Sequence, residues 1–348
     1  MTKFRHNDYS SHIDEDFVYD SEFYPDDKDL PDPQINPIIP GAQIGLDKVG
    51  VTGVDLPMKF LRRDGSTQEL HVKASLYGSL DDPKAKGLNL SRFPVIMHEE
   101  IANHMSIDGL RNCLVRLQKK QGSKHVYCKL RFKYPWVQEA LRTRKELPED
   151  APDKDVFKVV EGVKLSHEKM LGYIFYDCIL EGQLHIDEIT NEWNNQVLRV
   201  PTFKFFLTVE YIYSSTCPCS YELAQDAKRR RGKAANGHSQ RSIGRITVQF
   251  NPSEHIVWVE DIVEMARQQV PTEVVVICKR RDEQAFAELN GSNLLFTEDA
   301  SRLLFEGLDQ MFKDGKVLDF SIVTEHLESL HPWSATAVVA KGIPGGLR

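Results

Sequence analysis

A strict two-residue alternation in the stretch VYCKLRFKY, residues 126–134, narrows the folds open to this chain more than any other feature. Apolar side chains alternate there with basic ones. Successive side chains of a β-strand point to opposite faces, so the pattern predicts a strand with one buried and one solvated face. Such strands are typical of antiparallel sheets. The buried positions are Cys128, Leu130, Phe132 and Tyr134, and the solvated ones are Lys129, Arg131 and Lys133.

Further strands and helices are predicted on both sides of this stretch. Strands fit VTGVDLPMKFL and QELHVKASLYG before it, and residues 170–184, residues 200–214, RITVQF and TEVVVIC after it. Apolar spacing of three to four predicts helices over residues 95–120, with a break near Ser106–Gly109, and over 258–269 and 297–313. Each half of the chain therefore mixes antiparallel strands with paired helices. This predicts an α+β architecture with internal duplication.

The composition indicates a flexible tail, a cell compartment and a class of partner that is disfavoured. Residues 1–45 are rich in Asp, Glu, Pro and Tyr, which predicts a flexible acidic tail, with folded sequence beginning near Lys48. No secretory signal and no membrane-spanning apolar run is found in the sequence. Six scattered cysteines suit a reducing cytoplasm. The formal charge of -7 argues against general nucleic-acid binding.

Two segments in the second half offer ligands for a metal ion. In SSTCPCSYE, Cys217 and Cys219 flank Pro218, which makes the chain leave the preceding strand and exposes a thiol. In GHSQRS, His238 offers a ring nitrogen and Arg241 a guanidinium for phosphate. Two half-buried cysteines and a surface histidine are the plain alternatives. Because one loop connects Cys217 to His238, we predict that both reach the same metal ion.

Carboxylates further along the chain can complete this site. Glu283 in KRRDEQAFAE can serve as a third ligand that leaves one position open for water, although the segment also reads as a solvated charge run. Glu298 follows Thr297, a predicted helix N-cap, and can accept the N–H donors of a guanine edge. Glu328 and His331 are spaced to share one face of a helical turn, where they can act as an acid–base pair.

Other motifs carry less information. HEEIANH places its histidines six residues apart, which differs from the four-residue spacing of a zinc protease helix. KRRRGK, residues 228–233, resembles a nuclear-localisation signal, but it lies between Cys217 and His238 in an acidic chain and is predicted to be a solvated insertion. Neither a P-loop nor a strand followed by G-x-G-x-x-G is present.

Taken together and in order, these segments resemble the type IB GTP cyclohydrolase family. The resemblance runs from about residue 48 to 340. The matching strings are GVTGVDLP, KGLNLSRF, CPCSYE, GHSQRS, WVEDIVEMA, CKRRDE, TED at 297–299 and ESLH at 328–331. The chain departs from the family where HNQR is HSQR, where KRPDE is KRRDE, and where Pro332, Trp333 and Ser334 replace N-H-N.

The resemblance implies a fold and an assembly. It implies a tunnelling fold, in which each subunit carries two ββααββ-like halves with antiparallel sheets and paired helices on one face. The expected division is a tail over 1–45, one module over 46–185 and a second over 186–348 that carries most of the metal site. A homotetramer in the cytoplasm, binding neither nucleic acid nor membrane, is expected.

The resemblance also implies an activity and its residues. The activity is hydrolysis of GTP to 7,8-dihydroneopterin triphosphate and formate, the first step of tetrahydrofolate synthesis. The implied cofactor is Mn, Fe(II) or Zn, which would supply hydroxide to C8 of the purine. The implied metal ligands are Cys217, His238 and Glu283. The implied catalytic residues are Cys217, His331 and Glu328, and the implied substrate-binding residues are Glu298, Arg241, Arg92 and Lys279.

Two other functions remain open on the sequence alone. One is a related tunnelling-fold enzyme acting on another purine or deazapurine, either a cyclohydrolase that forms a cyclic phosphate or a nitrile reductase that consumes NADPH. The other is a non-catalytic module stabilised by zinc, which would turn over no purine.

Overall fold

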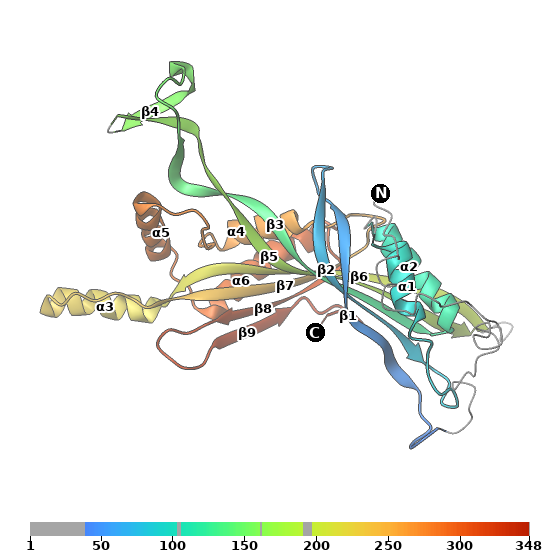
Figure 1. Cartoon of the computed structure of the whole chain (residues 1–348). Coiled ribbons are helices and arrows are strands. Elements are labelled where there is room, and N and C mark those ends of the chain that lie inside the picture. Colours follow the sequence, from blue (N-terminus) through green and yellow to red (C-terminus); the bar gives the residue numbers. More distant parts are fainter. Residues whose placement is uncertain (1–38, 103–105, 161, 191–196, 348) are drawn as a thin grey trace, which may run out of the picture. The chain divides into compact units, whose positions relative to one another are not determined.

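One antiparallel sheet organises the part of the chain that the structure describes. The structure is a computed structural model, and it describes residues 39–102, 106–160, 162–190 and 197–347. Nine strands form a single sheet in the order β1-β2-β3-β5-β6-β7-β8-β9, with β4 paired to β5 beside this path (Figure 1). The strands are β1 Leu46–Leu61, β2 Thr67–Leu80, β3 His125–Glu146, β4 Val156–Val160, β5 Val163–Thr190, β6 Val197–Thr216, β7 Ser239–Phe250, β8 Asp319–His326 and β9 Ala335–Ala340.

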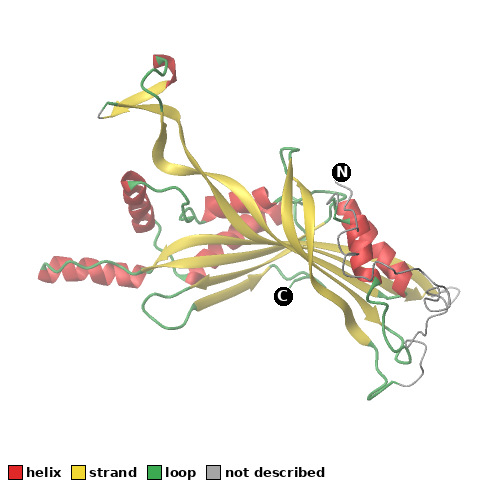
Figure 2. Ribbon diagram, viewed as in Figure 1, coloured by secondary structure: helices red, strands yellow, loops and turns green. Residues whose placement is uncertain are grey.

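The helices lie between strands in both halves of the sequence (Figure 2). They are α1 Arg92–Glu100, α2 Ile107–Gln121, α3 Pro218–Arg231, α4 Val259–Gln269, α5 Arg280–Ser292 and α6 Thr297–Lys313, together with the 3-10 turn Asp153–Asp155. The predicted helices over 258–269 and 297–313 are confirmed as α4 and α6. The predicted break near Ser106–Gly109 is also confirmed, because α2 begins at Ile107 after the N-cap Ser106.

The helices α2 and α6 cover the same face of the sheet. A Cβ atom on Gly182 would lie 3.0 Å from Leu110 of α2, and one on Gly244 would lie 3.2 Å from Leu304 of α6. Gly182 pairs with Phe205 on β6, and Tyr211, six residues along that strand, pairs with Gly244. Because partners across strands and residues an even number apart share a face, both glycines lie on one side. The core therefore fills one face, and small residues let the helices approach it.

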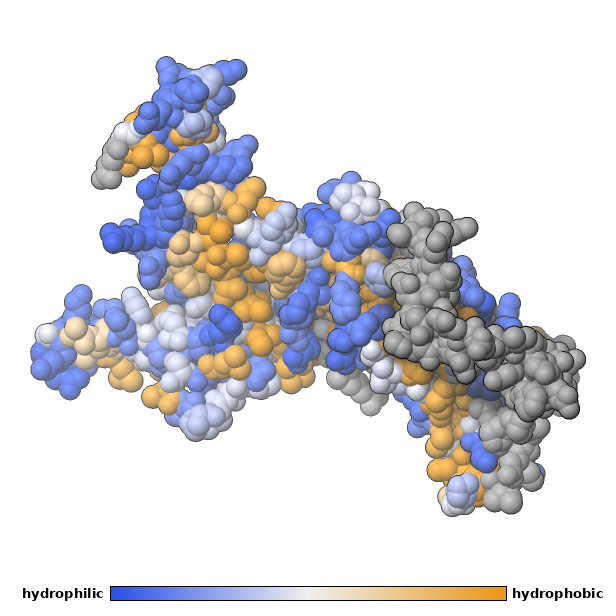
Figure 3. All heavy atoms as spheres, viewed as in Figure 1, coloured by the Kyte–Doolittle hydropathy of each residue, from blue (hydrophilic) through white to orange (hydrophobic). Residues whose placement is uncertain are grey.

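The opposite face carries charged side chains in ion pairs. Lys129 lies 3.1 Å from Glu181, and Arg245 lies 2.8 Å from Glu210. Towards β4, this polar character is interrupted where β5 carries exposed apolar side chains, which gather in a patch visible in Figure 3. Leu171, Tyr173 and Phe175 are exposed along this part of β5.

The predicted tunnelling fold with two ββααββ-like halves is wrong. The strands of both halves belong to one nine-stranded antiparallel sheet, because β5 and β6 pair residue by residue from Cys178 with Val209 to Thr190 with Val197. The second half holds four helices, α3 to α6, instead of one pair. Sequence periodicity identifies strands and their faces, but it does not determine which strands pair.

The strand predicted for TEVVVIC is also wrong. Glu273 forms only an isolated bridge with Tyr213. The segment is held to β6 by a few bonds, in which Ser214 N–H donates to Thr272 O at 2.8 Å and Val274 N–H donates to Ile212 O at 3.2 Å. The Glu273 carboxylate accepts from Arg267 Nε at 2.7 Å. Buried polar groups are held by hydrogen bonds, and the bond from Arg267 to the Glu273 carboxylate, together with the two backbone bonds to β6, holds the segment in place without a strand ladder.

The basic segment 228–233, predicted to be a solvated insertion, is mainly helical. Its basic residues form the last turn of α3, which ends at Gly232 with φ 60°. Cations at the C-terminal end of a helix interact favourably with its dipole, and glycine adopts this left-handed conformation without strain. Figure 1 shows α3 projecting beyond the ends of β6 and β7.

The chain divides into two compact units. One consists of residues 46–81 and 88–348 and holds the whole sheet and all of the helices described above. In the other, the described residues are 39–45 and 82–87, where Ala85 N–H donates to Asp82 O at 3.0 Å in a turn. Most of the predicted acidic tail, residues 1–38, lies outside the described residues.

A substitution under α2 tests the shared core. Leu114 is fully buried, so Leu114→Ala is expected to lower the free energy of unfolding by about 2–5 kcal/mol. Val95 on α1 is 52% exposed, so Val95→Ala is expected to change it by less than about 0.5 kcal/mol. Urea unfolding followed by circular dichroism measures both. Equal effects of the two substitutions would contradict the assigned core.

Candidate functional site

The ends of β6 and β7 bring Cys217 and His238 together. Thr216, the last residue of β6, pairs with Ser239, the first residue of β7. One residue beyond this pair, the Cys217 N–H donates to the His238 carbonyl at 3.1 Å. The chain between them therefore leaves the sheet and returns to it at the same place.

Local sequence explains why the chain turns at this point. Cys217 is the N-cap of α3 and Pro218 occupies its first turn, where the missing N–H of proline is not needed. On the return path, a Cβ atom on Gly237 would lie 2.9 Å from the Tyr221 backbone, so α3 and the returning chain approach closely. Ser220 Oγ accepts a hydrogen bond from the His238 N–H at 3.0 Å, which holds the His238 backbone against α3.

Glu328 joins this pair from the end of β8. The Leu327 N–H donates to the Arg241 carbonyl at 3.2 Å, which continues the β7–β8 ladder past His326. Glu328 Oε2 then lies 3.8 Å from His238 Nδ1, and the two side chains are 13% and 20% exposed. An imidazole and a carboxylate therefore lie side by side at one end of the sheet, partly open to solvent, and the backbone of Cys217 adjoins the histidine.

A chain of buried hydrogen bonds extends from His238 into the protein. His238 Nδ1 is 3.0 Å from Gln240 Oε1, and Gln240 Nε2 donates to Ser215 Oγ at 2.8 Å. Ser215 Oγ lies 3.2 Å from His326 Nδ1, and His326 Nε2 lies 3.0 Å from the Tyr213 hydroxyl. All four inner residues are buried. The chain links a solvent-facing histidine to a histidine in the core.

This arrangement fixes the tautomer of His238. Because the Gln240 amide nitrogen donates to Ser215, its oxygen faces His238 and can only accept. A neutral His238 must then carry its proton on Nδ1, which leaves the lone pair on Nε2. Histidines that ligate metals are held in this way by a partner at the other ring nitrogen.

His326 is kept neutral at physiological pH. Burial lowers its pKa to about 4, and the negative charge of Glu298 partly opposes this shift. Burial also raises the pKa of the Tyr213 hydroxyl. Both groups are therefore uncharged members of the hydrogen-bonded chain near pH 7.

The start of α6 lies beside the same strand end. Leu295 N–H donates to Thr216 O at 3.2 Å, and Thr297 Oγ1 lies 3.0 Å from Thr324 Oγ1. The predicted N-cap at Thr297 is one residue off, since Phe296 is the N-cap and Thr297 is the first helical residue. Glu298, in the first turn, is exposed and close enough to His326 to influence its pKa. The carboxylate predicted to hold guanine thus belongs to this end of the sheet.

Four of the residues predicted for the active site lie elsewhere on the surface. Glu283 and Lys279 are at the start of α5, His331 is in a loop, and Arg241 is on a strand. Glu283 is exposed in the first turn of α5, and Lys279, its N-cap, donates to Glu146 Oε1 at 2.9 Å. His331 is exposed and stacks on Trp333 with ring centroids 4.2 Å apart. Arg241 is an exposed residue of β7.

The remaining predicted substrate residue lies in the first half of the chain. Arg92 begins α1, and its Nη1 donates to the Lys120 carbonyl at 3.0 Å. It shares no element with Cys217 or His238. The structure therefore places Cys217 next to His238 along the backbone and Glu328 beside the His238 ring, with Glu298 nearby, and it leaves Glu283, Arg92 and Lys279 on other elements.

The donor atoms at this site suit a divalent metal in kind. A thiolate, an imidazole nitrogen and a carboxylate are ligands of Zn, Fe(II) and Mn. The His238 tautomer leaves Nε2 available, and Cys217 is only partly buried. Within the described residues, no three Cys, His, Asp or Glu side chains already gather closely enough to hold an ion. Cys217 and His238 are thus two residues with suitable donor atoms that the fold places next to each other along the backbone.

Sequence reasoning missed the buried chain that supports His238. Its signal was a two-residue period in three strands, because residues two apart share a face. Reading every second residue gives Tyr213 and Ser215 on β6 with Cys217 just after it, Gln240 and Ser242 on β7 with His238 just before it, and His326 on β8 with Glu328 two residues on. Polar residues at buried positions of otherwise apolar strands would have identified them.

Comparison with known proteins identifies the family. A sequence model described as type I GTP cyclohydrolase folE2 matches residues 30–153 and 157–337. The GTP cyclohydrolase FolE2 of Ruegeria sp. strain TM1040 is 34% identical over 335 residues, covering 92% of this chain and 78% of the relative. That of Ruegeria pomeroyi is 32% identical, covering 96% and 79%. This chain therefore belongs to the GTP cyclohydrolases, and within them to the type I folE2 family.

Solved structures that resemble the chain are more distant. Uricase from Arthrobacter globiformis covers 90% of this chain and 98% of its own, with a TM-score of 0.41 and 10% identity. A hyperthermostable mutant urate oxidase of Bacillus sp. TB-90 gives a TM-score of 0.42 and 8% identity over 85% of this chain and 98% of its own. Among the described residues, none of the helices is both long and apolar enough to span a membrane.

The neutral His326 makes stability depend on pH. Its pKa is about 4 in the folded protein and about 6.5 in the unfolded chain, so the unfolded state binds the proton more readily. Stability from this group is full above pH 6.5 and falls as the pH drops towards 4. At pH 5 the expected loss is about 2 kcal/mol. Urea unfolding at pH 7 and pH 5 measures it.

The control for this prediction is a second histidine. His326→Gln should remove that part of the acid-side loss, whereas His255→Gln, on the loop before α4, should retain it. An unchanged pH dependence in His326→Gln would show that another group is responsible.

Proposed function

We propose that the site at the ends of β6, β7 and β8 is where this GTP cyclohydrolase hydrolyses GTP to 7,8-dihydroneopterin triphosphate and formate. The reaction is the first step of tetrahydrofolate biosynthesis. The observation that supports the proposal is that Cys217 adjoins His238 along the backbone while Glu328 lies beside the His238 ring, at one partly exposed strand end. Family membership supports the reaction, and the geometry supports the place.

We propose that Cys217 and His238 hold a divalent metal, either Mn, Fe(II) or Zn, with Glu283 as a third ligand. The bound ion would supply Lewis-acid chemistry, which makes water nucleophilic at neutral pH. Glu283 occupies the first turn of α5 and is exposed, so its side chain is free to be recruited. The affinity order of divalent metals does not select among the three ions.

The protein's own groups position the purine and transfer protons. Glu298 would accept the N–H donors of the guanine edge, which orients C8 towards Cys217 and His238. Glu328, beside His238, would accept a proton from the attacking water. His331, exposed in the same loop as Glu328, would return protons to the ring nitrogens as the C8–N bonds break and formate leaves. Cys217 would act in catalysis through its place at the metal.

The triphosphate needs cationic partners. Arg241, Arg92 and Lys279 are proposed for this role because guanidinium and ammonium groups bind phosphate oxygens strongly. They lie on β7, on α1 and at the start of α5. We propose a cytoplasmic homotetramer, in which such separate cations serve one substrate.

Loss of either placed ligand is expected to abolish activity. Cys217→Ala and His238→Ala should each reduce formation of the fluorescent oxidised neopterin from GTP by at least about 100-fold. The assay uses metal-stripped protein to which Mn, Fe(II) or Zn is returned without oxygen. Cys278→Ala, which removes an exposed cysteine next to α5, should stay within about twofold.

The outcomes separate the alternatives. Full activity in both ligand variants would refute the site. No turnover of GTP by the wild type, with tightly bound zinc, would indicate a structural metal module. Consumption of NADPH on a deazapurine without formate from GTP would indicate a nitrile reductase.

A conservative change at Gln240 tests how His238 is held. Gln240→Met keeps the length of the side chain but removes the acceptor at His238 Nδ1, so metal affinity should fall about 10- to 100-fold. The matched control is Gln249→Met, which makes the same change at a buried position at the other end of β7. Metal affinity is measured by competition with a chelator. Equal affinities in the two variants would contradict the role of Gln240.

A further inference from the structure

A pair of histidines faces each other at the end of the sheet far from the candidate site. His125 is the first residue of β3 and pairs directly with His185 on β5. Their Nδ1 atoms are 3.0 Å apart, and both side chains are half-buried. His185 also pairs with Thr202, fourteen residues before Thr216 on β6, so about 45 Å of strand separates this pair from Cys217.

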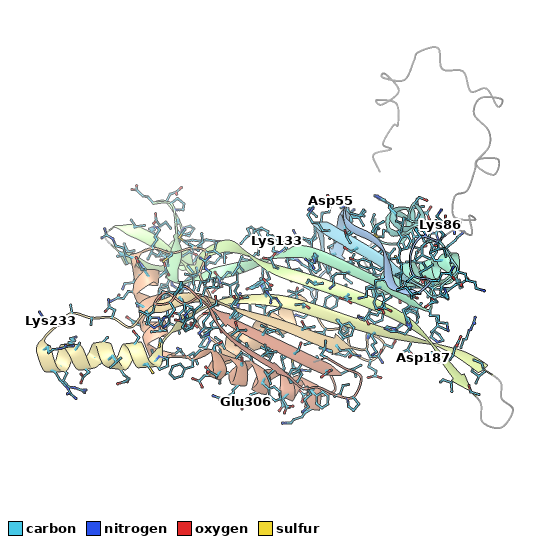
Figure 4. All side chains as sticks on the ribbon, turned by 90° about the horizontal axis from the view of Figure 1, so that it is seen from below. Asp55, Lys86, Lys133, Asp187, Lys233 and Glu306 are labelled. Carbon is cyan, nitrogen blue, oxygen red and sulfur yellow. The ribbon has the colours of Figure 1, made fainter. Side chains whose placement is uncertain are left out.

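The two histidines lie on the face that α2 does not cover. Gly182 faces α2, and residues an odd number away along β5 point to the other side. Glu181, Gln183 and His185 therefore share the polar face with His125 and Tyr127. Figure 4 labels Asp187, two residues after His185, at the end of the sheet opposite α3 and Lys233.

A chain of hydrogen bonds prepares His185 as a ligand. Lys129 lies 3.1 Å from the Glu181 carboxylate, which accepts from Gln183 Nε2 at 2.8 Å. The Gln183 amide oxygen therefore faces His185 Nε2, at 3.0 Å. An amide oxygen only accepts, so Nε2 carries the proton and Nδ1 keeps its lone pair. The lone pair points at His125.

The distance between the two nitrogens matches one class of metal geometry. With metal–nitrogen bonds of about 2.1 Å, two adjacent ligands at right angles lie about 3.0 Å apart, whereas a tetrahedral ion would separate them by about 3.4 Å. Square-planar or octahedral coordination by imidazole is typical of Ni(II) and Cu(II). The observed 3.0 Å is the length of the hydrogen bond between the two rings, and it also equals the right-angle spacing of that class.

We propose that His125 and His185 form a second metal site, which binds a late divalent transition ion of the Ni(II) or Cu(II) type between β3 and β5. Water completes the coordination. Without an ion, His125 donates its Nδ1 proton to His185 Nδ1. On binding, His125 changes tautomer: its Nδ1 proton leaves to solvent and Nε2 takes one up from solvent, so no net proton is released. The held tautomer of His185 needs no change.

The surroundings support binding near neutral pH. Burial lowers the pKa of His185, and the charges of His125 and Lys204 act in the same direction, so the ring is neutral and able to ligate. The rings of Tyr127 and His185 meet edge to face at 5.6 Å, which limits rotation of the imidazole. A bound ion would join two central strands of the sheet.

The test is a titration of the metal-stripped full chain with Ni(II), comparing wild type with three variants. His185→Gln should bind one Ni(II) fewer per chain. Gln183→Met keeps both imidazoles but removes the acceptor that holds the His185 proton on Nε2. The affinity of this site for Ni(II) should fall about tenfold. His167→Gln removes an exposed histidine elsewhere on β5 and should match the wild type.

Two further measurements complete the design. Ni(II) should raise the melting temperature of the wild type and of His167→Gln more than that of His185→Gln, because the ion binds only the folded site. GTP hydrolysis by His185→Gln with its own metal returned should stay within about twofold of wild type. This separates the site from the proposed active site.

The proposal fails if wild type and His185→Gln bind the same number of Ni(II) ions with the same affinity. If His185→Gln does not fold, the comparison of Gln183→Met with wild type decides, and equal Ni(II) affinities would then overturn the proposal.

Discussion

The ladder between β5 and β6 is the interaction on which the rest of the structure depends. It runs from Cys178 and Val209 to Thr190 and Val197 and joins the strands of both halves into one sheet. Because paired residues share a face, this register places Gly182 and Gly244 on the same side, beneath α2 and α6. A slip of one residue would turn every side chain of one half to the wrong face.

The same registers build the candidate site. The end of β6, the start of β7 and the end of β8 lie side by side, so Cys217, His238 and Glu328 all lie just beyond the point where the ladder stops. Behind them, the buried residues from Gln240 to Tyr213 are satisfied by one another. A fully bonded polar chain is rigid, and it holds His238 with its free nitrogen outward. The proposed site thus rests on a polar core that is also part of the folded interior.

The face of the sheet that α2 and α6 do not cover carries charged side chains, whereas the covered face is mostly apolar. The charged side chains pair as ions, as Lys129 does with Glu181, and these pairs are exposed enough to contribute little to stability. Their geometry still orients neighbours, since Glu181 fixes Gln183 and through it His185. A sheet end remote from GTP chemistry thereby acquires a pair of aligned imidazoles.

The sequence by itself determined the local elements and the chemistry of single residues. The alternation at 126–134, the helix at 297–313 and the turn at Pro218 follow from periods and backbone preferences that neighbours in the chain decide. The ordered strings determined the family. Only the tertiary structure decided that both halves form one sheet, that Thr272–Val274 lies against β6 without a ladder, and that Gln240, Ser215 and His326 support His238. These depend on pairing between distant strands, whose register no local pattern contains.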